Sequence, residues 1–161
     1  MNKNSPNKTK TDIGIKMPKG YIYNCCYHLV WCTKYRQPIF NTNTEHLELM
    51  SIINRVASQN DIDILNHEVK ANYVYLQITF PPKKSITNVV KLLKSSSARI
   101  WFAKYPQTKN KLWNGHLWDR SYYISTKDNV DKNIINTYIN TIRTTKANSG
   151  RKLKTETNSK Q

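Results

Sequence analysis

The chain has 161 residues and carries 26 Lys and Arg against 10 Asp and Glu, which gives a formal net charge of +16. Its 38% of hydrophobic and 11% of aromatic residues suffice for one folded domain with a single core, so a wholly disordered basic protein is excluded. No apolar run approaches the roughly 20 residues of a membrane span, and the first twenty residues do not resemble a secretory signal. A positive charge of this size most often faces a polyanion, and nucleic acid is the common case.

The excess charge is divided between two polar ends and the stretch between them. Residues 1–20 carry a net charge of +4 and residues 143–161 a net charge of +5, which leaves +7 for the middle of the chain. We therefore expect a disordered basic tail over residues 1–20, a folded domain over residues 21–145 and a flexible basic tail over residues 146–161.

Three cysteines lie in one short segment, at Cys25, Cys26 and Cys32. Their odd number and the absence of a C-x-x-C pair favour reduced, partly buried thiols in a cytoplasmic protein. A zinc site through Cys26 and His28 is the alternative, but further ligands of the usual spacing are missing.

The first predicted elements are a strand and a helix. Asn24 to Thr33 is rich in aromatic and β-branched residues, which favours a strand. Thr42 followed by Glu45 matches a capping box and predicts a helix that runs to about Asn60. The apolar residues of this helix are Leu47, Leu49, Ile52, Ile53 and Val56.

Two strands joined by a short turn come next. Ile62 to Val69 alternates in polarity, and Tyr73 to Phe80 does so more clearly before Pro81 and Pro82 end it. The face of the second strand that is expected to meet the helices consists of Val74, Leu76, Ile78 and Phe80. The opposite face consists of Tyr73, Tyr75, Gln77 and Thr79.

The last third of the chain predicts a helix over Ser85 to Lys104, a loop over Tyr105 to Gly115, a strand over Leu117 to Thr126 and a helix capped by Asp128. The expected core residues of the first of these helices are Ile86, Val89, Val90, Leu93, Ile100 and Trp101. The second helix runs through Ile134, Ile135, Tyr138, Ile139 and Ile142. The order β-α-β-β-α-β-α predicts an α+β fold, a ferredoxin-like or RRM-like antiparallel sheet with helices packed on one face.

Three stretches together resemble the TnpA transposases, the small single-tyrosine members of the HUH nuclease superfamily. They are the segment Tyr27 to Arg36 (YHLVWCTKYR), the strand Tyr73 to Phe80, and Leu117 to Thr126 (LWDRSYYIST) followed by a helix with Tyr138. The resemblance covers about residues 21–145. It implies the HUH transposase fold, a homodimer, and cleavage and rejoining of single-stranded DNA hairpins at transposon ends through a 5′-phosphotyrosine formed by Tyr138.

The resemblance also implies a divalent metal, Mg²⁺ or Mn²⁺, held by two strand histidines and a polar residue one helical turn beyond the tyrosine. Here Tyr73 and Tyr75 replace the histidines, and Ile142 stands where the family usually has glutamine. A phenol with a pKa of about 10 is a poor metal ligand at neutral pH, and losing ~5 kcal/mol of metal stabilisation slows a reaction more than a thousandfold. We therefore expect a degenerate site with no cofactor, in a protein that still binds DNA.

Several other interpretations of this site stay open from the sequence alone. If the turn places His67 opposite Tyr75, then His67 with Glu68 or His116 forms a rebuilt metal site, and the chain is an active transposase that needs Mg²⁺ or Mn²⁺. The two strand tyrosines either stack unpaired bases or pack under the last helix and fill the space of the lost metal. On an RRM-like sheet face, such tyrosines would equally suit RNA bases.

Cations that are expected to contact DNA phosphates lie mainly in the loop after the first strand. The primary candidates for DNA contact are the cations Lys34 and Arg36 together with Tyr35 between them, and the secondary candidates are Lys91, Lys94, Arg99 and Arg120. We expect a cytoplasmic, nucleoid-associated protein whose partners are single-stranded DNA hairpins, a second copy of itself and an active relative in mixed dimers, with no membrane partner. Its function would be regulation of that relative by competition for sites or by mixed dimers.

Overall fold

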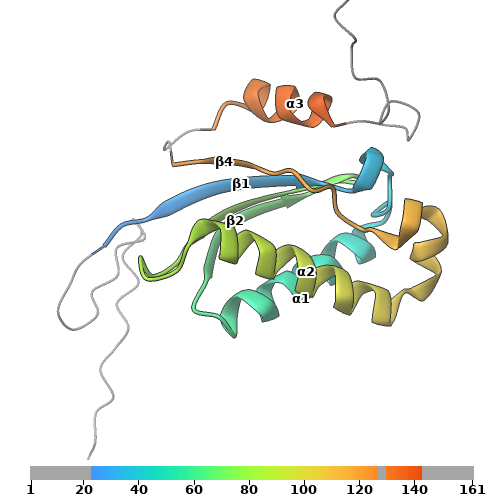
Figure 1. Cartoon of the computed structure of the whole chain (residues 1–161), viewed down its shortest axis with the longest axis horizontal. Helices are drawn as coiled ribbons and strands as arrows, with labels where there is room; N and C mark the ends of the chain where they lie inside the picture. The colour runs from blue at the N-terminus through green and yellow to red at the C-terminus, as the bar shows by residue number, and fades with distance from the viewer. Residues whose placement is uncertain (1–22, 127–129, 143–161) are drawn as a thin grey trace, which may run out of the picture.

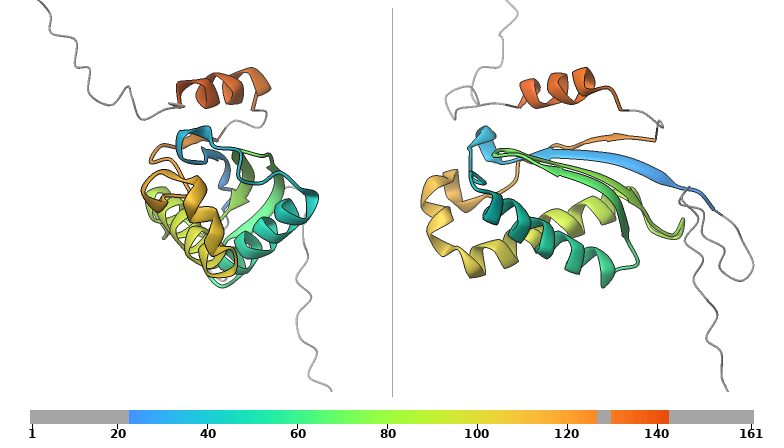
Figure 2. Two further views of the ribbon diagram at one scale, coloured as in Figure 1. Left: turned by 90° about the vertical axis from the view of Figure 1, so that its right-hand side faces the viewer. Right: turned by 180° about the vertical axis from the view of Figure 1, so that it is seen from behind.

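A computed structural model of the chain describes residues 23–126 and 130–142. They form a four-stranded antiparallel sheet in the order β2-β3-β1-β4, with α1 and α2 on one face and α3 across the other (Figures 1 and 2). The elements are β1 (Cys26–Cys32), α1 (Asn43–Ser58), β2 (Asp63–Val69), β3 (Tyr73–Thr79), α2 (Ile86–Lys104), β4 (Tyr123–Ser125) and α3 (Lys132–Thr141).

The predicted α+β class and order of elements are confirmed, with one change in the layers. The prediction that the helices pack on one face holds for α1 and α2, whereas α3 lies over the opposite face (Figure 2). None of the described helices combines the length and hydrophobicity of a membrane span. Two expected features lie outside the described residues: the tails over 1–20 and 146–161, and the predicted cap Asp128. The observed N-cap of α3 is Asp131, whose side chain accepts a hydrogen bond from the Asn133 amide.

The start of α1 confirms the predicted capping box. The Thr42 hydroxyl accepts a hydrogen bond from the Glu45 amide at 3.2 Å, and the Glu45 carboxylate accepts one from the Thr42 amide at 2.9 Å. Two of the helix's otherwise unpaired N–H donors are thereby satisfied. The helix begins at the residue after Thr42 for this reason.

The main core lies between the sheet and the two helices α1 and α2. The side chains of Val74, Leu76 and Ile78 are fully buried there, as the alternation along β3 predicts. Two apolar residues of the predicted helices face away from the core, because the side chains of Leu47 and Ile134 are 73% and 40% exposed. Leu47 lies two residues before the buried Leu49, on the far side of the helix, and Ile134 lies about 100° away from the row of α3 that meets the sheet.

The predicted strand over 117–126 is much shorter in the structure. Only β4 pairs continuously with β1, and Trp118 forms an isolated bridge with Thr33. Between them the chain leaves the sheet edge, and the Lys94 ammonium of α2 donates to the carbonyls of Asp119 at 2.6 Å, Arg120 at 3.3 Å and Ser121 at 3.0 Å. The predicted loop before this segment contains two 3₁₀ helices, at Pro106–Lys111 and Trp113–Gly115.

The register of the β2–β3 hairpin corrects the expected position of His67. The Lys70 amide donates to the Tyr73 carbonyl at 2.9 Å and closes the turn, so Glu68 lies opposite Tyr75 and His67 lies opposite Leu76. A shift of one residue moves a side chain to the other face of a sheet. His67 is therefore on the side of α1, away from the two strand tyrosines.

Candidate functional site

Helix α3 brings Tyr138 over the end of β1. Its inward residues Ile139 and Ile142 are buried against Cys32 of β1, and Tyr73 and Tyr138 pack against the same cluster. Burial in this apolar setting raises the pKa of the Cys32 thiol to about 12. The candidate nucleophile and two of the three positions of the family's metal ligands thus meet in one small apolar cluster.

The Tyr138 phenol is tied to the segment before β4 by a chain of hydroxyl contacts. Its oxygen lies 3.1 Å from the Ser121 hydroxyl, which donates to the Asp119 carboxylate at 3.0 Å. The other Asp119 oxygen accepts from the Lys34 ammonium at 3.4 Å. Burial raises the pKa of Tyr138, and the nearby Cys32 and Asp119 raise it further against the lowering effect of the Ser121 hydrogen bond. The phenol therefore stays protonated at neutral pH.

Tyr75 differs from Tyr73 in its contacts. Its hydroxyl lies 2.8 Å from Nδ1 of His28, and the two rings stack with centroids 6.0 Å apart. His28 is 4% exposed, so both rings are packed together on the sheet face that α3 partly covers. Burial is the main cause that raises the pKa of the Tyr73 and Tyr75 phenols.

The donor set around these tyrosines does not fit a divalent metal. Tyr73 and Ile142 contribute to an apolar cluster, and the Tyr75 hydroxyl is bonded to an imidazole. Within residues 23–126 and 130–142 there is no group of three or more His, Cys, Asp or Glu side chains that is arranged to hold a metal ion. The rebuilt site is not assembled either: His67 lines a small pocket beside His46 of α1, and His116 lines a groove beside α2.

The loop after β1 has an unusual backbone. Tyr35 and Arg36 both have positive φ angles, 54° and 55°, which non-glycine residues adopt at some cost. The Thr33 hydroxyl stabilises the loop by donating to the Gln37 carbonyl at 2.7 Å, and Tyr35 packs edge-on against Trp113. The Arg36 Nε is buried and has no hydrogen-bond partner among the described residues. A phosphate oxygen would satisfy this donor, so Arg36 remains the best candidate of the loop.

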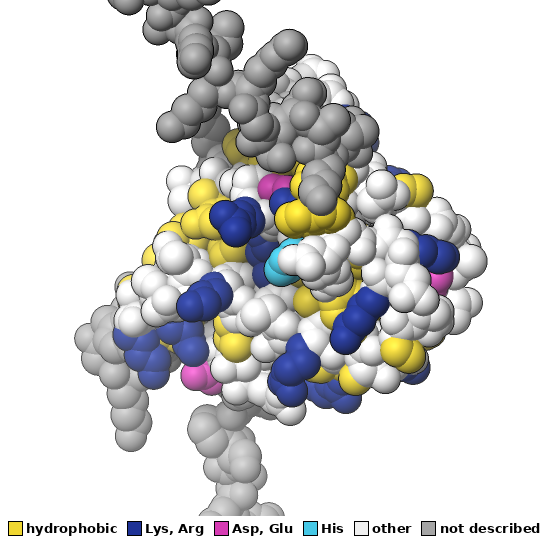
Figure 3. All heavy atoms as spheres, turned by 45° about the vertical axis from the view of Figure 1, so that its right-hand side comes forward, with side chains coloured by type: hydrophobic (Ala, Val, Ile, Leu, Met, Phe, Trp, Pro, Cys, Tyr) yellow, Lys and Arg dark blue, Asp and Glu magenta, His cyan; other side chains and the backbone are white. Residues whose placement is uncertain are grey.

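The predicted DNA-contacting cations fall into two groups. Lys91, Arg99 and Arg120 are exposed and remain candidates. Lys34 and Lys94 instead have internal partners: the Lys34 side chain is 15% exposed beside Asp119, and Lys94 binds three carbonyls. One face of the molecule shows more Lys and Arg than Asp and Glu side chains (Figure 3).

Lys94 provides a pH-dependent test of this arrangement. Burial lowers its pKa from 10.5 to about 8, against the raising effect of Asp119, so the folded protein binds fewer protons than the unfolded chain between about pH 8 and the ordinary lysine value. Stability contributed by this group therefore rises with pH across that window. Lys94→Met is expected to unfold more easily than wild type at pH 7, and the gap in unfolding free energy should widen toward pH 10. Urea melts at both pH values measure it; a gap that narrows would contradict this role.

Three residues of the site carried no clear signal in the sequence. The sequence presents His28 only in the zinc alternative with Cys26, and it does not indicate the roles of Asp119 and Ser121. Asp119 and Ser121 are two residues apart in a stretch that reads as a strand, where both side chains point to the same face. That spacing was the available signal, but their link to Tyr138, 17 residues from Ser121, depends on how α3 folds back over the sheet.

Comparisons with known proteins show the family to which the fold belongs. Residues 21–142 match the family described as "Transposase IS200 like". The chain is 38% identical over 125 residues to the ISDra2 transposase TnpA of Deinococcus radiodurans, covering 78% of this chain and 89% of that protein. It is 30% identical over 104 residues to the transposase for insertion sequence element IS200 of Salmonella typhimurium, covering 65% of this chain and 68% of that one.

A solved structure shares the fold as well. A crystal structure from Deinococcus radiodurans R1, provisionally described as that of a transposase, superposes with a TM-score of 0.75 at 34% identity, over 81% of this chain and 99% of that one. The family match spans β1, the β2–β3 hairpin and the helix with Tyr138. The chain therefore belongs to the IS200-like transposase family.

Proposed function

We propose that this chain binds single-stranded or hairpin DNA at transposon ends and has lost metal-dependent cleavage. The observation that carries the proposal is the apolar cluster in which Tyr73, Tyr138 and Ile142 meet at Cys32. In a cleaving enzyme of this type, charge stabilisation at the scissile phosphate has to be supplied next to the nucleophile. Here the side chains beside Tyr138 at these positions are aliphatic or phenolic, and burial raises the pKa of the Tyr138 phenol further above neutrality.

Binding is supported by features apart from the tyrosine. The described domain keeps exposed cations at Lys91, Arg99 and Arg120, and Arg36 presents an unpaired buried Nε in a strained loop. Contacts of this kind hold phosphates without a metal. A binding-competent relative that does not cut would regulate an active transposase in the cytoplasm, by competing for its DNA ends or by forming mixed dimers with it.

Retained cleavage through Tyr138 is the second candidate, and one observation favours it. The Tyr138 phenol has a hydrogen-bonded route through Ser121 to the Asp119 carboxylate, whose pKa is lowered, against the effect of burial, by the Ser121 hydrogen bonds and by Lys34. A carboxylate at the end of such a chain is able to accept the phenolic proton. The route supplies no charge stabilisation for the phosphate, which is why we rank this candidate second.

The binding proposal is tested by measuring affinity for oligonucleotides that cover both strands flanking the chain's own coding sequence. Fluorescence anisotropy is expected to show tighter binding to hairpin-forming DNA single strands than to the same sequences as RNA or as duplexes. Size-exclusion chromatography with light scattering is expected to show a dimer. Clear preference for the RNA copies would replace the proposal by an RNA-binding function, because the 2′-OH is the group that separates the two.

A further inference from the structure

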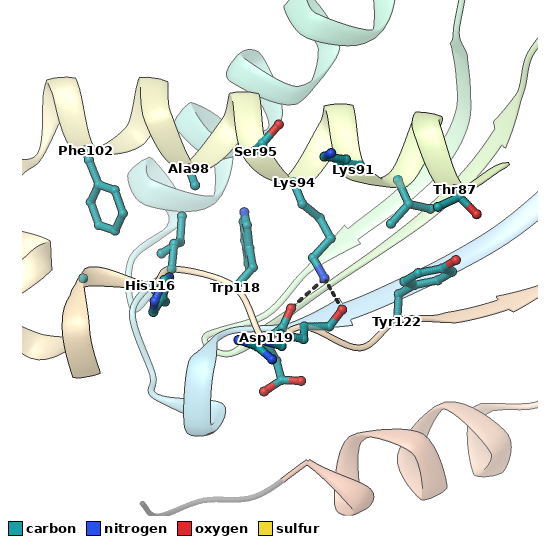
Figure 4. A pocket seen from close by; sticks show the side chains of 14 residues that line it. Thr87, Lys91, Lys94, Ser95, Ala98, Phe102, His116, Trp118, Asp119 and Tyr122 are labelled. Atoms are coloured by element: carbon teal, nitrogen blue, oxygen red, sulfur yellow. Dashed lines mark hydrogen bonds between the residues drawn. The ribbon is translucent and has the colours of Figure 1, made fainter. Parts of the chain in front are cut away.

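A groove runs between α2 and the segment Gly115 to Tyr122, and none of the functions above accounts for it. Its volume is about 380 Å³, at the lower end of the roughly 300–1,000 Å³ typical of ligand sites. Figure 4 shows α2 forming one wall and the segment forming the other, while α3 lies apart from it. The groove therefore lies apart from the apolar cluster at Tyr138 and shares with that site only Asp119, at the end of the Ser121 route.

The groove is formed by small side chains that lie between larger ones on one side of α2. Ser95 and Ala98 are small and stand between the larger Lys91 and Phe102 on the same side of the helix, so they leave a hollow. Its floor includes the indole of Trp118, which is 8% exposed and donates to the Ser97 hydroxyl at 3.1 Å. The opposite wall is held in place by the contacts of Lys94 with the carbonyls of Asp119, Arg120 and Ser121, of which Figure 4 draws those within the groove. The shape is thus fixed by the fold rather than by a bound partner.

The lining combines aromatic rings with cations. Phe102 and Tyr122 are half-buried and lie among the lining residues, and each has an ammonium over its ring: Lys109 at 5.3 Å from the Phe102 centroid and Lys94 at 5.9 Å from that of Tyr122. Lys91 and Arg120 are exposed at the groove. Its one acidic residue, Asp119, already accepts hydrogen bonds from Lys34 and Ser121, so the groove presents positive charge.

We propose that this groove is a binding site for an unpaired nucleotide of single-stranded DNA. The base would stack against the ring of Tyr122 or Phe102, and the adjoining phosphates would meet Lys91 and Arg120. Aromatic platforms inside a basic channel are the usual means of holding single strands without reading sequence. The groove is too small for a double helix, and an acidic peptide would leave the aromatic walls unused. This inference depends on the proposed DNA binding and names the site where the strand lies.

The experiment compares two DNA probes of about 16 nucleotides, a length at the upper end of single-strand binding sites: one with bases and one made only of abasic deoxyribose phosphates. Of Tyr122→Leu and Phe102→Leu, the variant that removes the stacking ring is expected to weaken binding of the base-containing strand roughly 5- to 100-fold, as loss of one stacked base does, and to leave the abasic strand unaffected. Tyr122→Phe keeps the ring and should bind like wild type. Thermal unfolding followed by circular dichroism verifies that each variant is folded.

A second pair of variants separates charge from stacking. Lys91→Gln with Arg120→Gln is expected to weaken both probes and to reduce the slope of log K against log salt by about one to two units. The exposed Arg55 on α1 offers a charge-matched control, and Arg55→Gln should change affinity far less.

Three results would overturn either the assignment of a nucleotide site to the groove or the DNA-binding function on which that assignment depends. Wild-type affinity in both leucine variants would remove the groove as a base site while leaving the DNA-binding proposal intact. An equal loss of duplex and single-strand binding would replace the nucleotide site by a backbone contact with double-stranded DNA. Absence of single-strand binding by the wild-type chain itself would instead overturn the proposed function.

Discussion

Restoring the family's metal-ligand positions, by Tyr73→His, Tyr75→His and Ile142→Gln together, is expected to raise the rate of Mn²⁺-dependent cleavage of single-stranded DNA at least about a thousandfold. Neutral imidazoles bind such metals where phenols do not. The first and third positions already converge beside Tyr138 in the wild-type fold, and Tyr75 is on the same strand face as Tyr73. Cleavage is measured as a covalent protein–DNA adduct on denaturing gels, with and without Mn²⁺.

Two controls make the restoration result specific. Adding Tyr138→Phe to the triple variant should abolish the adduct, and Ile142→Gln alone should produce none, because one ligand does not make a metal site. Some loss of stability is expected, since Cys32, Ile139 and Ile142 are buried together and a polar side chain is costly there. A triple variant that folds and binds both DNA and Mn²⁺ but cleaves no faster than wild type would contradict the role assigned to these positions.

Asp119→Asn is expected to lower the free energy of unfolding by about 2 kcal/mol at pH 7. The Asp119 and Lys34 side chains are only 16% and 15% exposed, and the carboxylate also accepts from the Ser121 amide and hydroxyl. Such a pair lies between an exposed ion pair, worth about 0–1 kcal/mol, and a fully buried one, whose disruption costs about 3–5 kcal/mol. Urea denaturation followed by tryptophan fluorescence measures the difference.

The pH dependence of this variant has a definite sign. The pKa of Asp119 is lowered in the folded protein, because its hydrogen bonds from Ser121 and the charge of Lys34 outweigh burial. Its contribution is therefore complete above the ordinary aspartate value of about 4 and is lost as the pH falls through the folded value. The gap between wild type and variant should close at low pH. The control is Glu68→Gln, which removes an ion pair with Lys70. The side chains of Glu68 and Lys70 are 45% and 52% exposed, so this variant should leave stability unchanged. A difference in unfolding free energy between wild type and Asp119→Asn that persists at low pH would contradict the charge-based account.

Local patterns predicted the fold well where local interactions determine it. The capping box at Thr42 and Glu45 set the start of α1, and the alternation along Tyr73 to Thr79 separated the core face of β3 from its outer face. The capping box joins residues three positions apart, and the two faces of a strand alternate every residue. Both patterns can be recognised directly in the sequence. The family match was likewise carried by short motifs that the chain preserves.

Contacts between distant segments were the part that the sequence did not reveal. The predicted strand is shortened where three of its carbonyls accept hydrogen bonds from Lys94, which is 25 to 27 residues away from them. The position of His67 depended on one residue of hairpin register, which the turn decides. The route from Tyr138 through Ser121 to Asp119 exists only because α3 returns over the sheet. Each depends on tertiary packing that no periodicity encodes.

The central claim is that this IS200-like transposase relative binds single-stranded DNA without cutting it. The most direct measurement incubates the wild-type chain with radiolabelled hairpin single strands and Mn²⁺, and divides each sample between a native and a denaturing gel. We predict a shifted complex on the native gel and no covalent adduct on the denaturing gel, for wild type and Tyr138→Phe alike. A wild-type adduct that disappears in Tyr138→Phe would contradict the claim.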